Sequence, residues 1–350
     1  MSEKIRVLIT GSGGAGTLGR ELVKAFLMTD NEYEIIATNS NPIDLYINNE
    51  VKMLQIPNAT SPDYIEKLLE ICKKENIQTI APGSEPETEI ISKNSQIFLE
   101  KNIITLTNRY DLVKLCNNKL SLSKFLTSKG IKSPKTFSFD EISEKTFSDY
   151  PLLIKPVSGS GSRNVFVAQN FEEISFFTKY LIKQKIEPII QEYISGIDNE
   201  FSIGILYCEG GKLSTSIAMR RNLHSGLSTR SVIKSDQNES LIISSGISQG
   251  YFDDFLEIRR KAEDIASILN SNGPINIQCR IKDNELYVFE INPRFSGTTS
   301  ARAILGCNEP DILSKFRIFG EIPEKNMYKQ GYVMKDFVER FVPKNDINQE

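Results

Sequence analysis

The sequence predicts a protein of mixed class, with an α/β domain first and an α+β region after it. Over the first hundred residues, short apolar runs alternate with helical patterns, which is typical of a parallel sheet covered by helices on both faces. Farther along, strand-like runs follow one another with few helices between them, which favours antiparallel pairing. Glycine-rich stretches at 10–19 and 158–162 each follow a predicted strand, where ligand-binding loops are common.

The N-terminal domain is predicted to span residues 1–115 and to have a Rossmann-like architecture. We expect strands at 5–10, 33–38, 52–57, 78–82 and 102–106, and helices at 63–75 and 86–101. Two further helices lead to a proline-containing connector at 131–139. We place the domain boundary near residue 115, between these two helices.

The second domain is predicted to span residues 116–320, with a small lid at about 134–195. In the lid, strands at 151–157 and 163–169 flank the second glycine loop, followed by a helix and a strand. The remaining elements are expected at 199–207, 212–219, 228–234, 254–271 (a helix), 275–281 and 285–291. Residues 321–350 should add one strand, at 331–342, and a frayed polar end.

Composition excludes several classes of function. The 42 Lys and Arg residues nearly balance 45 Asp and Glu, so we expect neither nucleic acid nor an anionic membrane as a partner. No apolar run approaches the roughly 18 residues that span a bilayer, and the N-terminus lacks the apolar core of a signal peptide. Five scattered cysteines without a CxxC pair fit a reducing cytoplasm.

Motifs of two enzyme classes are absent. The single histidine, His224, excludes an HExxH zinc site. The chain has no G-x-x-x-x-G-K-[ST], so a Walker loop is not expected.

The first glycine loop, TGSGGAGTLG, contains G-x-G-x-x-G at Gly11, Gly13 and Gly16 between a strand and a helix. This is the setting of dinucleotide-binding loops. However, the second strand ends at 38–40 in Thr-Asn-Ser, without the carboxylate that would bind a ribose. We therefore favour a tight strand-to-helix turn, and a NAD-dependent dehydrogenase remains the alternative.

The second glycine loop is more specific. A strand brings Lys155 to a run of small residues, and a second strand returns. A lysine beside an amide-rich hairpin is suited to holding phosphates, although an ordinary flexible hairpin would have the same pattern. The strand that ends in Glu192, Tyr193 and Ile194 could offer backbone groups to an adenine edge. Glu200 follows where a carboxylate could accept ribose hydroxyls.

The hairpin INIQCRI-KDN-ELYVFEIN places polar residues on one face. A ladder centred on Asn284 pairs Gln278 with Glu290 and Asn276 with Asn292. The opposite, apolar face should then carry Ile275, Ile277, Cys279, Ile281, Tyr287, Phe289 and Ile291. Carboxylate and amide oxygens without His or Cys suit Mg²⁺, and Arg294 follows directly. A solvent-facing polar surface is the alternative.

With these motifs in their order along the chain, the sequence resembles the ATP-grasp superfamily. It is most similar to the single-chain ligases related to carbamoyl phosphate synthase, over residues 4–320. The resemblance implies an ATP-grasp fold and a ligase that joins a carboxylate to an amine through an acyl phosphate, releasing ADP. ATP and Mg²⁺ are the implied cofactors, with Mn²⁺ as the alternative ion. Self-association as a homodimer stays open.

The resemblance also implies roles for individual residues. Lys119 and Lys155 would contact ATP phosphates, under a loop formed by Ser158, Gly159, Ser160, Gly161 and Ser162. Glu192, Tyr193 and Ile194 would bracket the adenine, and Glu200 would bind the ribose. The magnesium ligands would be Gln278, Glu290 and Asn292. Arg294 would be catalytic and face the transferred phosphoryl group.

The substrates are the least defined feature of the sequence. The segment 220–231, with Arg220 and Arg230, matches the family poorly where substrate contacts are expected, and Ser296 and Gly297 are further candidates. Glu85 and Glu87 follow the fourth predicted strand and could bind a cationic amine, or could stabilise the next helix through its dipole. A dehydrogenase and a catalytically silent ATP-binding module stay open as alternative functions.

Overall fold

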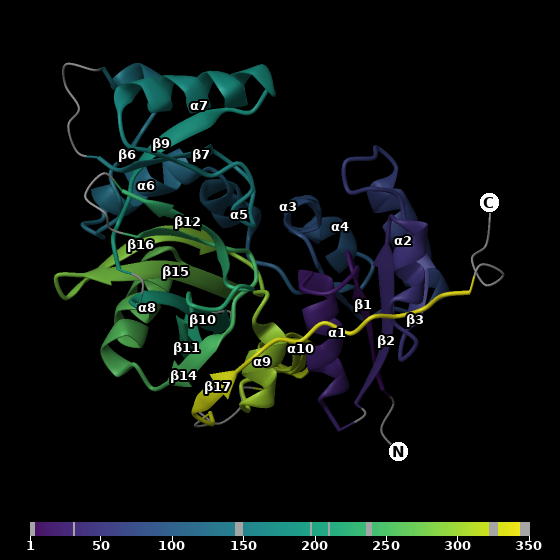
Figure 1. Ribbon diagram of the computed structural model, residues 1–350. Helices are drawn as coiled ribbons and strands as arrows, with labels where there is room; N and C mark the ends of the chain where they lie inside the picture. Colours follow the sequence, from purple (N-terminus) through teal and green to yellow (C-terminus); the bar gives the residue numbers. More distant parts are fainter. Residues whose placement is uncertain are drawn as a thin grey trace.

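The computed structural model describes residues 4–30, 32–143, 150–196, 198–208, 211–235, 240–321 and 328–343. Its elements form two bodies that lie side by side, with the N-terminal sheet in one and the antiparallel sheets in the other (Figure 1). The predicted frayed end, 344–350, lies outside the described residues.

The N-terminal sheet is parallel and five-stranded, as the alternating pattern predicts. Its order is β3 (Lys52–Gln55), β2 (Tyr33–Asn39), β1 (Ile5–Ile9), β4 (Thr79–Ala81) and β5 (Ile104–Thr105). Helix α1 (Leu18–Leu27) packs on one face and α2 (Tyr64–Lys74) on the other, each over its own core cluster. A short 3-10 helix, η1 (Pro42–Tyr46), follows β2.

One predicted helix of this domain is two. The segment expected at 86–101 forms α3 (Glu85–Lys93) and α4 (Ser95–Leu99), which meet at Asn94. The Asn94 side chain donates a hydrogen bond to the Ile90 carbonyl at 2.8 Å and so satisfies a carbonyl at the end of α3. The capping side chain explains the break, which apolar periodicity alone does not reveal.

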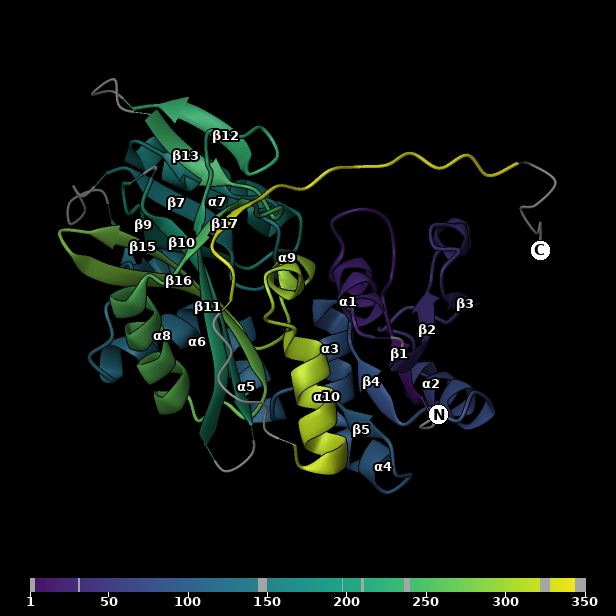
Figure 2. The ribbon, with the colours of Figure 1, turned by 90° about the horizontal axis from the view of Figure 1, so that it is seen from below.

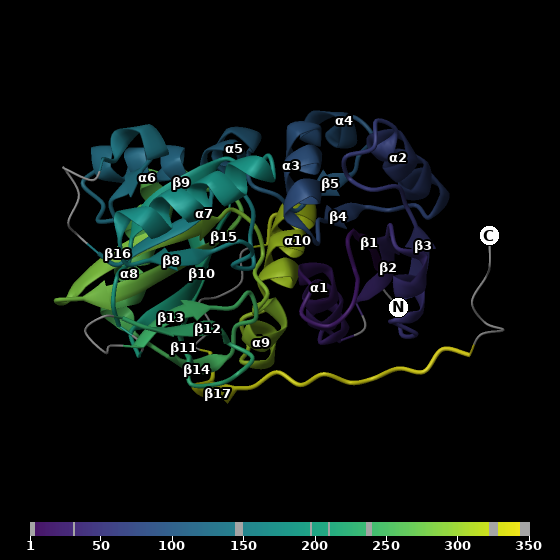
Figure 3. The same ribbon diagram turned by 45° about the horizontal axis from the view of Figure 1, so that its top comes forward.

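The lid is a four-stranded antiparallel sheet. Its order is β6 (Thr136–Phe137), β9 (Pro188–Glu192), β7 (Leu152–Pro156) and β8 (Phe166–Ala168). A short 3-10 helix, η2 (Phe139–Glu141), follows β6. Helix α7 (Phe171–Lys183) covers one face of this sheet, which Figure 3 shows with the lid turned forward. The other face is turned toward the rest of the second body.

A six-stranded antiparallel sheet forms the floor beneath the lid. Its order is β16 (Glu285–Asn292), β15 (Pro274–Lys282), β10 (Glu200–Cys208), β11 (Lys212–Arg221), β14 (Gly250–Asp253) and β17 (Gly331–Val333). Helices α5 (Tyr110–Asn117), α6 (Lys119–Ser128) and α8 (Leu256–Ile268) contribute to its core. The predicted strand 331–342 is therefore much shorter, and the segment after Val333 runs across to the first body (Figure 2).

A two-stranded ribbon lies beside the lid. It pairs β12 (Thr229–Lys234) with β13 (Ser240–Ser244), and the sequence predicted only the first of these strands. The strand β14 was also missed. Both missed strands are short, and β14 pairs with partners distant in sequence.

The polar hairpin has the predicted register at its functional end. Gln278 pairs with Glu290 and Asn276 with Asn292. A bulge between Gln278 and Cys279 then shifts the ladder by one residue. As a result Val288 and Leu286 enter the core, whereas the predicted core residues Tyr287 and Phe289 lie on the polar face. A β-bulge reverses the side-chain alternation beyond it.

The last helices join the two bodies. Helices α9 (Thr299–Ile304) and α10 (Glu309–Phe319) pack against α1. Arg317, on α10, donates hydrogen bonds to the Thr107 carbonyl at 3.0 Å and to the Asn272 carbonyl at 2.7 Å. The predicted second domain, 116–320, includes this segment without an expected helix, and Leu313 packs in the core cluster that contains β1 and α1.

Candidate functional site

A cavity of about 1000 Å³ lies between the lid, the six-stranded sheet and the N-terminal domain. Most of the predicted site residues line it: Glu85, Lys119, Lys155, Ser158 to Ser162, Glu192, Tyr193, Ile194, Glu200, Gln278, Glu290, Arg294, Ser296 and Gly297. Segments that are distant in sequence therefore converge on one space, large enough for a nucleotide and a small substrate.

Two lysines occupy one wall of the cavity. Lys155 is buried on β7, and its Nζ donates a hydrogen bond to Gln191 Oε1 at 2.7 Å. Burial, together with the nearby Lys119, lowers the pKa of the Lys155 ammonium to about 7, although Glu290 acts in the opposite direction. Lys119, at the start of α6, donates to the Gly159 carbonyl at 2.6 Å. An anion in the cavity would therefore meet two cationic side chains.

The second glycine loop closes this wall. Gly159 and Gly161 have positive φ angles of 102° and 71°, a conformation that favours glycine, and no atom lies within 4 Å of where their Cβ atoms would be. Ser162 donates a hydrogen bond to the Ser244 carbonyl, at 2.6 Å, and so joins the loop to the end of β13. The loop has open space on one side and a defined contact on the other.

The predicted adenine segment lies at the end of β9. The Tyr193 hydroxyl is held by the backbone of Ile242, accepting from its N–H at 2.8 Å and donating to its C=O at 3.3 Å. Glu192 Oε2 accepts a hydrogen bond from the Lys135 N–H at 3.1 Å. Phe289, turned to this face by the bulge, adds an aromatic side chain to the cavity wall.

The predicted magnesium ligands are divided by their surroundings. Gln278 and Glu290 line the cavity, and within the described residues neither side chain has a hydrogen-bond partner. Asn292 is buried behind them, where its Oδ1 accepts a hydrogen bond from Arg294 at 3.2 Å. The unengaged carboxylate and carboxamide oxygens fit a hard cation such as Mg²⁺. They would hold the ion beside the phosphates.

Arg294 connects the second body to the first. Its Nη2 lies 2.7 Å from Glu85 Oε1, and its Nη1 donates to the Phe295 carbonyl at 2.8 Å. The charge of Glu85 is therefore already balanced by a guanidinium. This pairing disfavours the idea that Glu85 binds a cationic amine.

Glu87 does not line the cavity. It is buried in the first turn of α3, where its carboxylate accepts hydrogen bonds from Ser84 at 2.7 Å and Tyr64 at 3.1 Å. Burial raises the pKa of the Glu87 carboxyl, which Ser84 and Tyr64 partly offset. The expectation that Glu87 contacts substrate is not met, because its carboxylate is enclosed within the first domain.

The two arginines proposed for substrate binding also lie away from the cavity. Arg220 and Arg230 are exposed, and neither lines the cavity. The alternation of β11 instead turns Arg221 inward, where it is only 3% exposed. Ser296 and Gly297 do line the cavity, next to Arg294.

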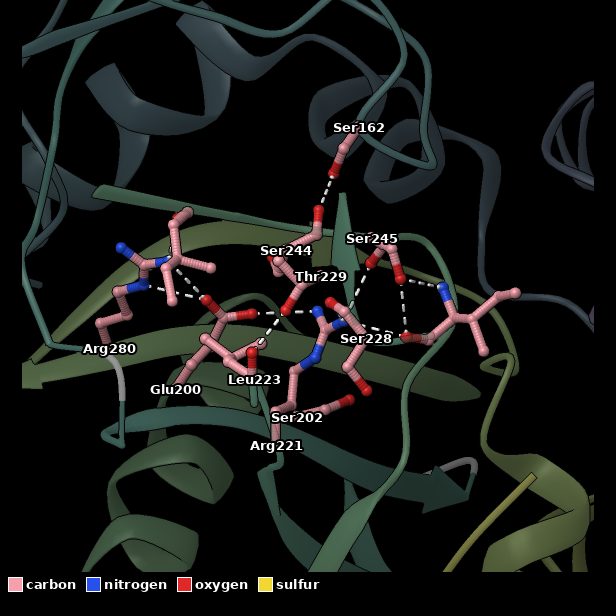
Figure 4. Close-up of polar contacts among 12 residues, drawn as sticks. Ser162, Glu200, Ser202, Arg221, Leu223, Ser228, Thr229, Ser244, Ser245 and Arg280 are labelled. Atoms are coloured by element: carbon pink, nitrogen blue, oxygen red, sulfur yellow. Dashed lines mark hydrogen bonds and ion pairs between the residues drawn. The ribbon is translucent and has the colours of Figure 1, made fainter. Parts of the chain in front are cut away.

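Three buried charges lie beneath the ribbon β12–β13 (Figure 4). Glu200, at the start of β10, has no exposed surface and is paired with Arg221 at 2.9 Å and with Arg280 at 2.8 Å. Burial would raise the pKa of the Glu200 carboxyl, but the two guanidinium groups outweigh it and hold that pKa below its ordinary value. The sequence pointed to Glu200 but to neither arginine.

The first glycine loop contributes only its edge to the cavity. Gly11, Gly16 and Thr17 line the cavity, and the Cβ position of Gly16 lies 3.6 Å from the Ile247 side chain. Gly19 serves packing, because a Cβ there would lie 2.6 Å from the Gly11 carbonyl oxygen, and a Cβ on the neighbouring Gly83 would overlap the Thr10 carbonyl oxygen and the Cα of Gly19. This geometry agrees with a tight turn between β1 and α1.

Two family models match the chain. Residues 116–298 match the ATP-grasp domain, and residues 7–106 match the N-terminal domain described as PylC-like. Among curated proteins, the carbamoyl phosphate synthase large chain of Thermotoga sp. (strain RQ2) is 20% identical over 364 residues, covering 94% of this chain and 31% of its own. That of Clostridium beijerinckii is 26% identical over 254 residues, covering 69% and 23%. The chain thus spans a third or less of the length of these relatives.

Solved structures share the fold at low identity. The L-amino acid ligase of Bacillus licheniformis has a TM-score of 0.63 at 16% identity, covering 90% of this chain and 74% of its own. The D-alanine–D-alanine ligase of Bacillus anthracis has a TM-score of 0.58 at 16% identity, covering 90% and 97%.

The dehydrogenase and silent-module alternatives gain no support from these matches. Among the described residues, no helix is long and apolar enough to cross a membrane. The ATP-grasp model alone covers more than half of the sequence, and the converging lysines, glycine loop and oxygen ligands fall within it. The chain therefore belongs to the ATP-grasp family.

Proposed function

We propose that this protein joins a small carboxylate to an amine, using ATP and Mg²⁺ and releasing ADP. The observation that carries the proposal is the single cavity in which Lys119, Lys155 and the second glycine loop face Glu290 and Arg294. One end of the cavity has cationic and amide-rich walls for the phosphates. The other end, at Ser296 and Gly297, has room for the acid.

The reaction has two steps. A carboxylate oxygen attacks the γ-phosphorus of ATP, the bond to the β–γ bridging oxygen breaks, and ADP leaves. The amine nitrogen then attacks the acyl carbon, phosphate leaves with the C–O bond electrons, and the nitrogen loses a proton. The products are the amide, ADP and phosphate.

The residues of the cavity mainly position the reactants and balance charge. Lys155 and Lys119 hold the phosphates, and the loop 158–162 excludes water from the acyl phosphate. Arg294, held in place by Glu85, faces the phosphoryl group in transfer. Gln278 and Glu290 would hold a magnesium ion, which would neutralise further phosphate charge, and Asn292 could join them only if its Oδ1 left Arg294.

Three parts divide this work in our proposal: residues 1–115 contribute to binding the acid, 116–320 bind ATP, and β17 completes the six-stranded sheet. The acid would enter between Gly16 and Gly297, where small residues leave space. The pairing of Glu85 with Arg294 favours recognition of the acid at this end over recognition of an amine.

An ADP-release screen tests the proposal. Amino acids, hydroxy acids and sugar acids are combined with a panel of amines, with Mg-ATP present and Lys155→Met as the inactive control. We expect ADP release that requires both an acid and an amine, together with an amide product. ADP release that needs no acid, or an acid that is activated but never joined to an amine, would contradict amide formation.

A further inference from the structure

The buried Glu200 cluster is more elaborate than one charge pair requires. Arg221 and Arg280 come from different strands, β11 and β15, and each donates to one carboxylate oxygen of Glu200 at 2.9 Å. Two guanidinium groups for one carboxylate leave a net buried positive charge. Burying such charges costs free energy unless all of their hydrogen bonds are satisfied, so the remaining partners of the two arginines are informative.

Arg280 uses its remaining donors on the adenine side of the cavity. Its Nη1 donates to the Ile194 carbonyl at 2.6 Å, and its Nη2 donates to the Ile242 carbonyl at 3.0 Å. Its guanidinium also lies over the Tyr193 ring, 5.1 Å from the ring centroid. Arg280 therefore holds the end of β9, the predicted adenine segment, against β13.

Arg221 uses its Nη2 on the opposite side, whereas its Nε has no hydrogen-bond partner among the described residues. Its Nη2 donates to the Ser245 carbonyl at 2.9 Å and to the Ile247 carbonyl at 3.1 Å. These carbonyls belong to the loop after β13. Figure 4 shows this loop next to Ser244, whose carbonyl accepts a hydrogen bond from the Ser162 hydroxyl. Gly246 lies between them, and a Cβ there would come within 2.9 Å of the Gly161 Cα. Arg221 therefore holds the surface that the second glycine loop meets.

We propose that Glu200, Arg221 and Arg280 are a positioning device with two arms. Arg280 fixes the adenine wall, and Arg221 fixes the segment 244–247 on which the glycine loop closes. Glu200 holds the two arms at a fixed separation, because each of its oxygens binds one guanidinium. This inference rests on the proposed function, since it assumes that the cavity binds ATP.

The two arms predict different defects. Removing Arg280 should loosen the adenine wall and leave intact the phosphate wall, which is formed by Lys119, Lys155 and the loop 158–162. Removing Arg221 should leave the adenine wall intact and weaken closure of the second glycine loop. A cluster that only stabilised the fold would show neither pattern, since both variants would then alter all ligand contacts alike.

The first experiment compares Mg-ATP with Mg-tripolyphosphate, which can use only the phosphate wall. Calorimetry should show that Arg280→Met lowers the affinity for Mg-ATP at least tenfold and changes the affinity for Mg-tripolyphosphate less than twofold. Arg280→Lys keeps a charge opposite Glu200 but cannot reach both carbonyls, so it should show the same selectivity more weakly. It decides the question if the methionine variant does not fold. Equal losses for both ligands, or no loss, would overturn the role of Arg280.

The second experiment uses Arg163, an exposed trypsin site directly after Ser162. With Mg²⁺ and β,γ-methylene-ATP, trypsin cleavage after Arg163 should slow at least tenfold in the wild type. Arg221→Met should lose most of this protection at a nucleotide concentration that saturates the variant. Full protection in Arg221→Met would overturn the role of Arg221.

A matched control separates positioning from general stability. Arg317 also donates to three backbone carbonyls, those of Thr105, Thr107 and Asn272, but does not line the cavity. Arg317→Met should lower the melting temperature and leave the affinities and the protection unchanged. If the wild type binds neither ATP nor tripolyphosphate, the proposed function fails and this inference fails with it. If it binds both and the arginine variants behave like Arg317→Met, only this inference fails.

Discussion

The molecule contains two glycine loops with similar sequences and opposite physical roles. In the first, glycine is required because backbone segments touch: a Cβ on Gly19 would lie 2.6 Å from the Gly11 carbonyl oxygen. In the second, no atom lies within 4 Å of the Cβ positions of Gly159 and Gly161. Glycine is favoured there only because the backbone has positive φ angles. The first loop is a packed joint between strand and helix. The second is an open loop over the cavity.

This difference shows what a glycine-rich motif can and cannot indicate. G-x-G-x-x-G in the first loop has the dinucleotide spacing, but the close backbone contacts there are those that join Gly11 and Gly19 to each other and to Gly83. The second loop has no special spacing, but it lies beside Lys155 and Lys119. The charge next to a glycine loop is therefore more informative about phosphate binding than the spacing of its glycines.

Arg294, which lines the same cavity as both loops, should give the largest effect. Because charge develops on the phosphoryl group during transfer, Arg294→Ala should lower kcat by ~10²–10³, with little change in ATP affinity. Steady-state kinetics and calorimetry measure the two quantities. A normal kcat with a raised KM would show that Arg294 only binds the ground state.

The packed role of the first loop can be tested by Gly83→Ala. The new methyl group would overlap the Thr10 carbonyl oxygen, so we expect a loss of about 3 kcal/mol in the free energy of unfolding. Urea denaturation measures it. Gly14→Ala is the control, since no atom lies within 4 Å of its Cβ position. If both variants were equally stable, the first loop would not be a packed joint.

The charged role of the second loop can be tested by Lys155→Met. A charge-assisted contact to phosphate contributes ~1.5–3 kcal/mol, so ATP affinity should fall by roughly one to two decades. Calorimetry with Mg-ATP measures the loss. Unchanged affinity would remove Lys155 from the phosphate site.

The same lysine predicts a dependence on pH. The pKa of Lys155 is about 7 in the folded protein and about 10.4 when unfolded. The buried ammonium therefore lowers the free energy of unfolding, and the whole of this cost is present below about pH 7. The cost falls as the pH rises from about 7 toward 10, because the folded protein then loses the proton before the unfolded chain does. Because a bound phosphate favours the ammonium form, ATP binding at pH 8 should take up protons, as calorimetry in two buffers can measure. The same uptake in Lys155→Met would contradict the assignment.

The smallest effect is expected at Gly161. Alanine is strained at a φ of 71° but meets no neighbour, so Gly161→Ala should cost about 1 kcal/mol of stability. Thermal denaturation should show a small shift, in contrast with Gly83→Ala. A loss as large as that of Gly83→Ala would mean that the second loop is packed as tightly as the first.

Local sequence patterns predicted much of the architecture and the core of the site. The apolar alternation located the strands, and the pairing of Gln278 with Glu290 followed from the centre of the hairpin. Lys155 and its loop were recognisable because the charge and the small residues are adjacent in sequence. These features depend on neighbours within a few positions.

The features that were missed depend on distant partners. Nothing near Arg221 or Arg280 in sequence reveals that both meet Glu200, on a third strand. The bulge after Gln278 moved Phe289 to the cavity, and a strict period of two cannot reveal a bulge. Glu85 and Glu87 are two positions apart in the sequence, yet only the fold shows that Glu85 lines the cavity and Glu87 is buried.

Hydrogen exchange with and without Mg²⁺ and β,γ-methylene-ATP tests the central claim, that the second loop and not the first binds the nucleotide. We predict slower exchange in 153–165 and 189–195, which contain the loop, Lys155 and the end of β9. The first glycine loop, 10–19, should exchange at the same rate in both states. Protection centred on 10–19, with 153–165 unaffected, would contradict the account.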